Sequence, residues 1–363
     1  MALTKWDDYY IHQNFSTLDK IQSEDENAYE RACMTCASPD GAFYLAIALG
    51  IYPNRKITDA GIGIRYGNTQ RSMFISKPFD AENDRGDFML GPFHAKIIEP
   101  MKLWQIDLAG NDYGIGCSLM MEGRSAPWEA PVNWGQSSFP SLSIPIALSV
   151  HQSMRYSGTI TFEGKEYSAD GFLGGRDRTW GIRPVAEDPG KGFKVLGMEN
   201  WLFAHFSNYS VFLAGINLNQ AVLGKESEYF FSNIWGDDGT VTPLSEIRHR
   251  VEFLQPFEKQ REYAKEEWLM KDPAGKERHL VIRPISRSFY LGGVGYDGRQ
   301  GKDFGGFHIE GDTYDVSNPT VIGDKHWGIE HRVCEFQLDG DKGVGTTESI
   351  FSPLPDWKYK PTW

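Results

Sequence analysis

Hydrophobic positions in this chain fall mostly in short segments that either alternate with polar residues or run continuously up to a turn. Ala42–Tyr52 is almost continuously apolar, whereas Gly61–Tyr66 alternates with the period of two that places side chains on one face of a strand. Turn residues recur roughly every ten positions, which is typical of β-sandwiches and barrels. The same pattern predicts strands at Phe93–Glu99, Lys102–Leu108, Ile115–Met121, Tyr156–Phe162, Lys165–Gly171, Met198–Phe206, Val211–Asn217, Ser227–Ile234, Ile247–Leu254, Tyr263–Met270 and His279–Ile285.

Helical periodicity is rare in the chain. One polar, acidic segment, Asp19–Arg31, is predicted to form a helix that packs across a barrel end or stays loose. The chain is therefore predicted to be all-β, with antiparallel strands in barrels or sandwiches. A chain of 363 residues is longer than one that usually folds around a single hydrophobic core, so two domains are expected.

An internal repeat supports two domains. Tyr156–Pro184 aligns without gaps with Asp303–His331, and eight of the 29 positions are identical. Each copy is predicted to contain a strand, a Glu-Gly turn, a second strand, a loop and an Asp-x-x-Trp-Gly-Ile corner. Proline and glycine cluster in Arg183–Gly192, as in a linker. We therefore expect one domain at residues 1–185 and a second at 192–363.

Composition narrows the function classes. Hydrophobic residues make up 40% and charged residues 24%, which is typical of a globular protein. The formal net charge of −12, with no long basic cluster, opposes nucleic-acid binding. The sequence has no apolar run of about 18 residues and no secretory signal at its start, so we expect no membrane span and a cytoplasmic location.

The four cysteines include a Cys33-Met-Thr-Cys36 motif. A CxxC can be a redox pair or half of a zinc site, but no second CxxC and no His pair at ligand spacing accompanies it. Two ordinary thiols in a strand-rich region are the other interpretation. We expect neither a metal nor a cofactor.

The first corner, Arg176-Asp177-Arg178-Thr179-Trp180-Gly181, combines charge with an aromatic ring. Asp177 lies between two arginines and is expected to stay ionised, which suits the stabilisation of a cation. Arg178, Trp180 and Arg183 are candidate substrate-binding residues. The alternative is structural, because a Trp-Gly pair can close a barrel end and an Asp can accept backbone N–H bonds in a turn.

The second corner carries more acid–base groups. If His326 lies on a strand, Glu330 shares its face and the two could relay a proton, with Trp327 on the other face as a candidate binding residue. A surface charge cluster is the alternative. Upstream, Trp201, Phe203 and His205 share a strand face, which indicates an apolar pocket with one proton-handling group or a core strand with one satisfied histidine.

The segments Gly158–Lys165 and Asp177–Gly181 resemble the carotenoid 1,2-hydratase (hydroxyneurosporene synthase) and AttH-like superfamily. The resemblance implies a tandem pair of lipocalin-like domains, and relatives that hydrate an isoprenoid double bond or cyclise polyenes. Arg178 stands where the hydratase motif has a histidine, and an arginine cannot act as an acid at neutral pH. His205, His326 or Glu330 would then have to supply the proton.

Three hypotheses follow. The first is a cofactor-independent enzyme that hydrates, isomerises or cyclises an apolar small molecule, such as a terpenoid, steroid-like compound or polyketide, in a cavity near the domain interface. Asp177 and the aromatic rings would stabilise positive charge there. The second is a non-catalytic binding or carrier protein for the same hydrophobic ligands. The third is a structural or protein-interaction module without a ligand cavity.

Overall fold

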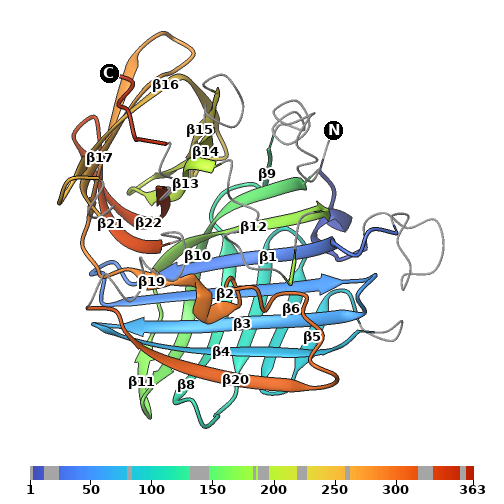
Figure 1. The fold of residues 1–363 in the computed structure, drawn as a ribbon. Helices are drawn as coiled ribbons and strands as arrows, with labels where there is room; N and C mark the ends of the chain where they lie inside the picture. Colours follow the sequence, from blue (N-terminus) through green and yellow to red (C-terminus); the bar gives the residue numbers. More distant parts are fainter. Residues whose placement is uncertain are drawn as a thin grey trace.

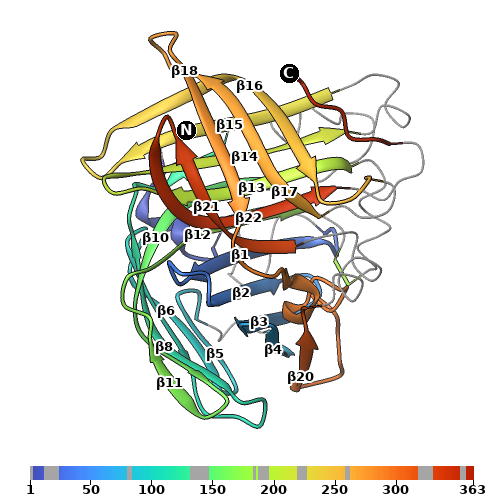
Figure 2. The same cartoon turned by 90° about the vertical axis from the view of Figure 1, so that its left-hand side faces the viewer.

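The computed structural model describes residues 3–11, 24–79, 84–130, 147–182, 185–186, 196–218, 227–257, 262–317, 330–351 and 357–363. These residues form two antiparallel sheets and two short 3-10 helices, η1 (Lys5–Asp8) and η2 (Leu291–Val294). The all-β prediction is therefore confirmed. One sheet is open and curled, and the other closes into a barrel (Figures 1 and 2).

The curled sheet has 13 strands in the order β20-β4-β3-β2-β1-β12-β10-β8-β7-β6-β5, with β9 and β11 also paired to β10. Its strands are β1 (Ala28–Ala37), β2 (Phe43–Tyr52), β3 (Ile57–Tyr66), β4 (Thr69–Pro78), β5 (Asp87–Leu90), β6 (Phe93–Glu99), β7 (Leu103–Leu108), β8 (Ile115–Gly123), β9 (Trp128–Glu129), β10 (Ala147–Phe162), β11 (Lys165–Ser168), β12 (Phe172–Ile182) and β20 (His308–Asp315).

The barrel follows the order β18-β17-β16-β15-β14-β13-β22-β21, and the pairing of β18 with β21 closes it. Its strands are β13 (Leu196–His205), β14 (Tyr209–Leu218), β15 (Ser227–Gly236), β16 (Val241–Phe253), β17 (Tyr263–Lys271), β18 (Glu277–Pro284), β21 (Glu330–Leu338) and β22 (Asp341–Phe351), with β19 (Phe289–Tyr290) added to β21. Buried side chains such as Trp268, Met270 and Phe336 pack in the core of this eight-stranded barrel.

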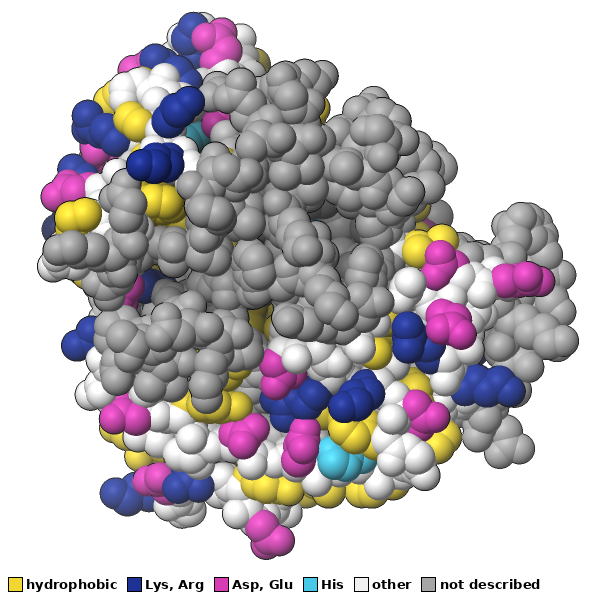
Figure 3. All heavy atoms as spheres, in the orientation of Figure 1, with side chains coloured by type: hydrophobic (Ala, Val, Ile, Leu, Met, Phe, Trp, Pro, Cys, Tyr) yellow, Lys and Arg dark blue, Asp and Glu magenta, His cyan; other side chains and the backbone are white. Residues whose placement is uncertain are grey.

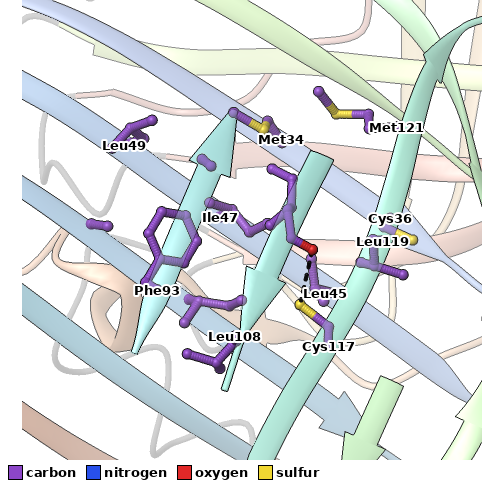
Figure 4. Packing of buried hydrophobic residues seen from close by; sticks show 14 of the residues in the cluster. Met34, Cys36, Leu45, Ile47, Leu49, Phe93, Leu108, Cys117, Leu119 and Met121 are labelled. Carbon is purple, nitrogen blue, oxygen red and sulfur yellow. Dashed lines mark hydrogen bonds between the residues drawn. The ribbon is translucent and has the colours of Figure 1, made fainter. Parts of the chain in front are cut away.

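The core of the curled sheet lies inside its concave face. Leu45 and Ile47 of β2 face Phe93 of β6, Leu108 of β7 and Leu119 of β8 across this core (Figure 4). Because successive side chains alternate, the neighbouring residues of β1 and β2 point outward. That outward face of β1, β2, β10 and β12 meets the barrel.

Most of the predicted strands are present. The apolar stretch Ala42–Tyr52 corresponds to β2, and Phe93–Glu99 coincides with β6. The predicted turn at Glu163-Gly164 joins β10 to β11, and both residues have positive φ there. The apolar pattern predicted no strand at the short strands β5, β9 and β19, or at β1, β4, β12, β21 and β22. In the longer strands of this group, buried polar residues or glycines interrupt the apolar spacing.

Two sequence predictions are wrong in detail. The last part of the predicted helix, Ala28–Arg31, begins β1, which lies between β2 and β12 and is buried along its whole length; residues 12–23 lie outside the described part of the chain. The Asp177–Gly181 segment is not a corner. It lies inside β12, paired with β1 on one side and β10 on the other.

The second copy of the repeat also differs from its predicted layout. β20 runs straight through Glu310 and Gly311, where a turn was expected, because all eight of its residues pair with β4 of the curled sheet. A segment from beyond residue 192 thus completes the edge of the sheet that the first 182 residues build. The domain limits 1–185 and 192–363 stay a prediction.

On the described part of the face seen in Figure 3, acidic and basic side chains are interspersed over the curled sheet. A nucleic-acid site would need a basic face instead. Among the described residues, no helix has the length and apolar character needed to cross a membrane.

Candidate functional site

β12 carries two different sets of side chains on its two faces. Arg178 and Trp180 point into the curled sheet, where Arg178 is buried, forms an ion pair with Glu30 and lies 3.8 Å from the ring centroid of Tyr10. Asp177 points the other way, toward the barrel, in register with Cys33 of β1. The predicted substrate-binding residues Arg178 and Trp180 are therefore not brought together with Asp177.

Asp177 is still mostly ionised at pH 7, as expected, but the two flanking arginines do not dominate its pKa. Arg176 reaches Asp8 at 2.8 Å on the concave side, and neighbouring positions on a strand face opposite ways. Burial dominates at Asp177 and raises the pKa of its carboxyl to about 6, although Oδ1 accepts the backbone N–H of Cys33 at 2.9 Å and the charge of Arg31 partly opposes the shift. Asp177 is half-buried.

The curled sheet and the barrel touch closely at one end of their interface. The ring of Phe203 on β13 lies directly against Gly175 of β12, and the hydroxyls of Thr35 and Thr346 are 3.3 Å apart. Phe203 and Thr35 are fully buried. Asp177, two residues after Gly175 on β12, is only half-buried. Glu199, four residues before Phe203 on β13, is also only half-buried. We call the part of the interface around these two more exposed carboxyls its loosened part.

Three carboxyl groups gather where the interface loosens. They are Asp177, Glu199 of β13 and Glu348 of β22, and each of the three is half-buried. Burial and the charges of Glu348 and Asp177 raise the pKa of Glu199 to about 8. Like charges in one site cannot all ionise together, so the group retains a proton near neutral pH.

Glu348 is held differently from the other two carboxyls. Its Oε2 bonds Nε2 of His331, and Nδ1 of the same ring bonds the hydroxyl of Tyr44. Tyr44 belongs to β2 of the curled sheet, whereas His331 and Glu348 belong to the barrel. This hydrogen-bonded chain links the two sheets beside the carboxyl group cluster.

A second histidine lies at the same interface. Trp201 donates its indole N–H to Nδ1 of His151 at 3.2 Å, and Nε2 of His151 is 3.0 Å from the hydroxyl of Ser149. An indole can only donate, so Nδ1 accepts and Nε2 carries the proton of the neutral ring. Burial lowers the pKa of His151 to about 3, and its ring stacks on Phe212 at 4.6 Å.

His205 lies at the closely packed end of the interface. Its Nδ1 is 3.3 Å from a guanidinium nitrogen of Arg124 and 3.3 Å from the hydroxyl of Ser153. Burial, with the charge of Arg124, lowers the pKa of His205 to about 3. His205 is therefore neutral at physiological pH and separated along β13 from Glu199.

Trp201, Phe203 and His205 do share one face of β13, as predicted, and that face meets the curled sheet. Arg183, His326 and Trp327 lie outside the described residues, and of Glu330 only the backbone, at the start of β21, is described. Their predicted roles stay predictions.

Sequence reasoning missed Glu199, Glu348, His151 and the link between His331 and Tyr44. Glu199 could have been found by extending the face of Trp201 two residues back along the strand. Glu348 gave no such signal, because β22 was not predicted.

Cys33 and Cys36 point to opposite faces of β1. Cys36 belongs to the core of the curled sheet, whereas Cys33 lies beside Asp177 on the barrel side. A disulfide or shared metal between them is excluded by this geometry. Among the described residues, no group of three or more His, Cys, Asp and Glu side chains is arranged to hold a metal ion.

The fold is similar to that of solved structures. A candidate AttH from Nitrosomonas europaea is 10% identical, with a TM-score of 0.53 over 93% of this chain and 96% of that one. The crystal structure of CghA is also 10% identical, with a TM-score of 0.53 over 91% of this chain and 90% of that one. Kievitone hydratase from Nectria haematococca is 9% identical, with a TM-score of 0.48 over 94% of each chain.

The first two matches show that this chain has an AttH-like fold, as the sequence resemblance implied. The comparison with curated proteins found no match in sequence. A family model described as "Family of unknown function (DUF8625)" matches residues 3–352. The chain therefore belongs to the DUF8625 family.

Proposed function

We propose that the loosened part of the interface between β12 and β13 binds an apolar small molecule and exchanges a proton with it through Asp177 and Glu199. The protein would then be a cofactor-independent hydratase, isomerase or cyclase. The observation that carries the proposal is the cluster of Asp177, Glu199 and Glu348, three half-buried carboxyl groups on two facing sheets.

This cluster can supply both an acid and a base near neutral pH. With a pKa of about 8, Glu199 keeps its proton at pH 7, whereas Asp177, with a pKa of about 6, is mostly ionised. Two carboxyls whose surroundings separate their pKa values are a common acid–base arrangement. The proton-donating role predicted for His205 passes to Glu199, because a histidine with a pKa of about 3 holds no transferable proton at pH 7.

Hydration can be written with all atoms balanced. Glu199 gives its proton to one carbon of a double bond, and the other carbon becomes cationic. The negative charges of Asp177 and Glu348 stabilise that cation. A water molecule adds to it, and the proton that this water releases goes to Asp177; proton exchange between the carboxyls restores the starting state. Without water, Asp177 takes a proton from a carbon next to the cation and an isomeric double bond forms. If a second double bond attacks the cation first, a ring forms, and loss of a proton from the new cation to Asp177 completes a cyclisation.

Aromatic side chains beside the carboxyls suit such a reaction. Trp201 precedes the closely packed end of β13, and Tyr296 lies beside Arg31, whose guanidinium carbon is 4.9 Å from its ring centroid. Aromatic faces attract cations and tolerate apolar ligands. The sequence resemblance to the carotenoid 1,2-hydratases makes an isoprenoid double bond one target of this class.

The experiment compares four proteins with the same mixture of organic-soluble metabolites, followed by untargeted mass spectrometry. They are wild type, Asp177→Asn, Glu199→Gln and the control Glu166→Gln, which changes an exposed carboxyl on β11. We expect wild type and control to produce a compound that has gained or lost one water, or an isomer. Each site variant should lower that rate about 10²-fold or more, the usual contribution of a general acid or base.

Two outcomes would overturn the proposal. One is a ligand that binds all four proteins equally and leaves unchanged, which would indicate a carrier protein. The other is that no compound in the mixture is retained or converted by any of the four.

A further inference from the structure

The hydrogen-bonded chain Tyr44–His331–Glu348 crosses from the curled sheet to the barrel. The side chain of His331 is 1% exposed, and that of Glu348 is 16% exposed. Tyr44 is fully buried. His331 is thus shielded from any ligand at the interface, and of the three only Glu348 reaches the loosened region.

One arrangement of donors and acceptors in this chain has Glu348 as a carboxylate. A carboxylate can only accept, so in this arrangement Nε2 of His331 carries the hydrogen of their bond. Nδ1 is then the acceptor for the hydroxyl of Tyr44. The ring is also held by packing, since its centroid lies 5.7 Å from that of Tyr44 and 6.0 Å from that of Trp201.

We propose that His331 is a positioning residue: its Nε2–H holds Glu348 as an anion, and this anion keeps the proton of the carboxyl cluster on Glu199. The inference rests on the proposed function, since it assigns the regulation of the same site. It adds that His331, which does not contact the ligand, determines which carboxyl of the cluster keeps the proton.

Charge supports this assignment. Hydrogen bonds to an ionised carboxylate favour its charged form, and a charged neighbour disfavours a second anion. After burial, the charge of Glu348 is the largest contribution that raises the pKa of Glu199, and it also raises the pKa of Asp177. If Glu348 could take the proton itself, Glu199 would ionise at a lower pH and would cease to be the acid.

Other charged and titratable groups face the same place. Arg31 and Cys33 come from β1, Asp177 from β12, and Tyr296 from the segment after η2. Arg31 opposes the shift at Asp177, whereas burial raises the pKa of the Cys33 thiol and of the Tyr296 hydroxyl so far that both stay neutral. His151, in register with Asp177, is also neutral. Glu348, which accepts the hydrogen bond from His331, is therefore the anion that raises the pKa of Glu199 most.

The test measures the ionisation of Glu199 directly, without a substrate. Full-length protein is labelled with ¹³C at the glutamate side-chain carboxyls, titrated by NMR, and the Glu199 signal is assigned by its loss in Glu199→Gln. Three variants are compared with wild type. His331→Leu removes the N–H donor to Glu348, His331→Gln replaces it with an amide N–H at similar reach, and Tyr44→Phe removes only the bond at Nδ1.

We expect the titration midpoint of Glu199 to fall by about one pH unit or more in His331→Leu, because Glu348 then competes for the proton. His331→Gln should restore the wild-type midpoint, and Tyr44→Phe should leave it nearly unchanged although it loosens the same contact between sheets. An unchanged midpoint in His331→Leu would overturn the inference. So would equal shifts in His331→Leu and Tyr44→Phe, which would indicate a purely structural role.

If His331→Leu does not fold, Glu348→Gln tests the charge through which His331 is proposed to act, and its titration midpoint is compared with that of His331→Gln instead. Glu348→Gln removes the anion while keeping the shape, so the Glu199 midpoint should fall by a similar amount, and an unchanged midpoint would contradict the inference. The titration distinguishes the two proposals. A protein without turnover in the metabolite experiment but with these shifts would refute the proposed function alone, and turnover without the shifts would refute the role of His331 alone.

Discussion

Gly175 of β12 lies against Phe203 of β13 so closely that a Cβ on Gly175 would be 2.2 Å from Cδ2 of the phenylalanine ring. Phe203 is fully buried, and Gly175 has its φ outside the left-handed region, so space rather than backbone conformation requires the glycine. This contact brings the barrel onto the curled sheet.

Gly175→Ala should therefore destabilise the protein. The added methyl group must push Phe203 away, and such overpacking costs about 1–3 kcal/mol, more than the roughly 0.4–1 kcal/mol that alanine gains by restricting the unfolded chain. The free energy of unfolding is measured by urea denaturation. Gly110→Ala is the matched control, since a Cβ there meets nothing within 4 Å. Equal stability of the two variants would show that the sheets do not rely on this contact.

The stability of the protein should fall between pH 6.5 and pH 8. Burial raises the pKa of Asp177 to about 6, of Asp59 to about 7 and, with help from neighbouring charges, of Glu199 to about 8. Unfolded carboxyls ionise near pH 4, so the folded state binds more protons between these values. The stabilisation is complete below about pH 4 and is lost as the pH rises through each folded-state value.

The two buried histidines contribute to stability with the opposite pH dependence: their contribution is lost as the pH falls. The pKa values of His151 and His205 are lowered to about 3, so their contribution is complete above about pH 6.5 and is lost as the pH falls toward 3. Of these carboxyls and histidines, only the carboxyls therefore change stability above pH 6.5.

Thermal unfolding at pH 6.5 and 8.0 tests this balance in wild type and Glu199→Gln. Wild type should lose on the order of 1 kcal/mol over this interval from Glu199, allowing for its partial exposure. Glu199→Gln should lose less and Glu166→Gln as much as wild type. A wild type that is equally stable at both pH values would contradict the raised pKa of Glu199.

Arg124 connects the two sheets through several bonds. Its guanidinium bonds both carboxylate oxygens of Asp237, at 2.9 and 3.1 Å, and the carbonyl of Phe206 at 2.6 Å, and only 3% of its side chain is exposed. Arg124→Met should cost about 1–3 kcal/mol, because it removes the donor to the carbonyl of the buried Phe206 and a bidentate partner of Asp237.

Lys102→Met is the control for Arg124→Met. Lys102 pairs with Glu99 on the surface, with 58% of its side chain exposed, and such pairs contribute about 0–1 kcal/mol. Urea denaturation measures both variants. The interpretation of Arg124 as a connection between sheets would be wrong if its loss cost no more than that of Lys102.

All four cysteines should resist thiol reagents in the folded protein. Cys33, Cys36, Cys117 and Cys334 are buried free thiols, and burial raises the pKa of each. The thiolate is the reactive form, so both access and ionisation are low. A colorimetric thiol assay should detect no reaction before urea is added and four thiols afterwards. Fast reaction of the Cys33-Cys36 pair in the folded state would contradict its placement on opposite faces of β1.

Part of the fold could be predicted because local patterns survive in it. β2 and β6 follow from their own apolar spacing, and Glu163-Gly164 forms the expected turn. β1 could not be predicted, since its charged residues Glu30 and Arg31 looked solvent-exposed. Glu30 is buried because Arg178, from another strand, neutralises its charge.

The candidate site divides in the same way. The sequence by itself determined the all-β class and most strand positions, because these depend on local period and composition. It also predicted Asp177 and Trp201 as site residues, and those roles stay predictions. Only the tertiary structure decided that Asp177 faces the barrel while Arg178 faces the core, and that Glu199 and Glu348 join it. Tyr44 and His331 are 287 positions apart, and no local pattern encodes a hydrogen bond that forms only when the two sheets pack together.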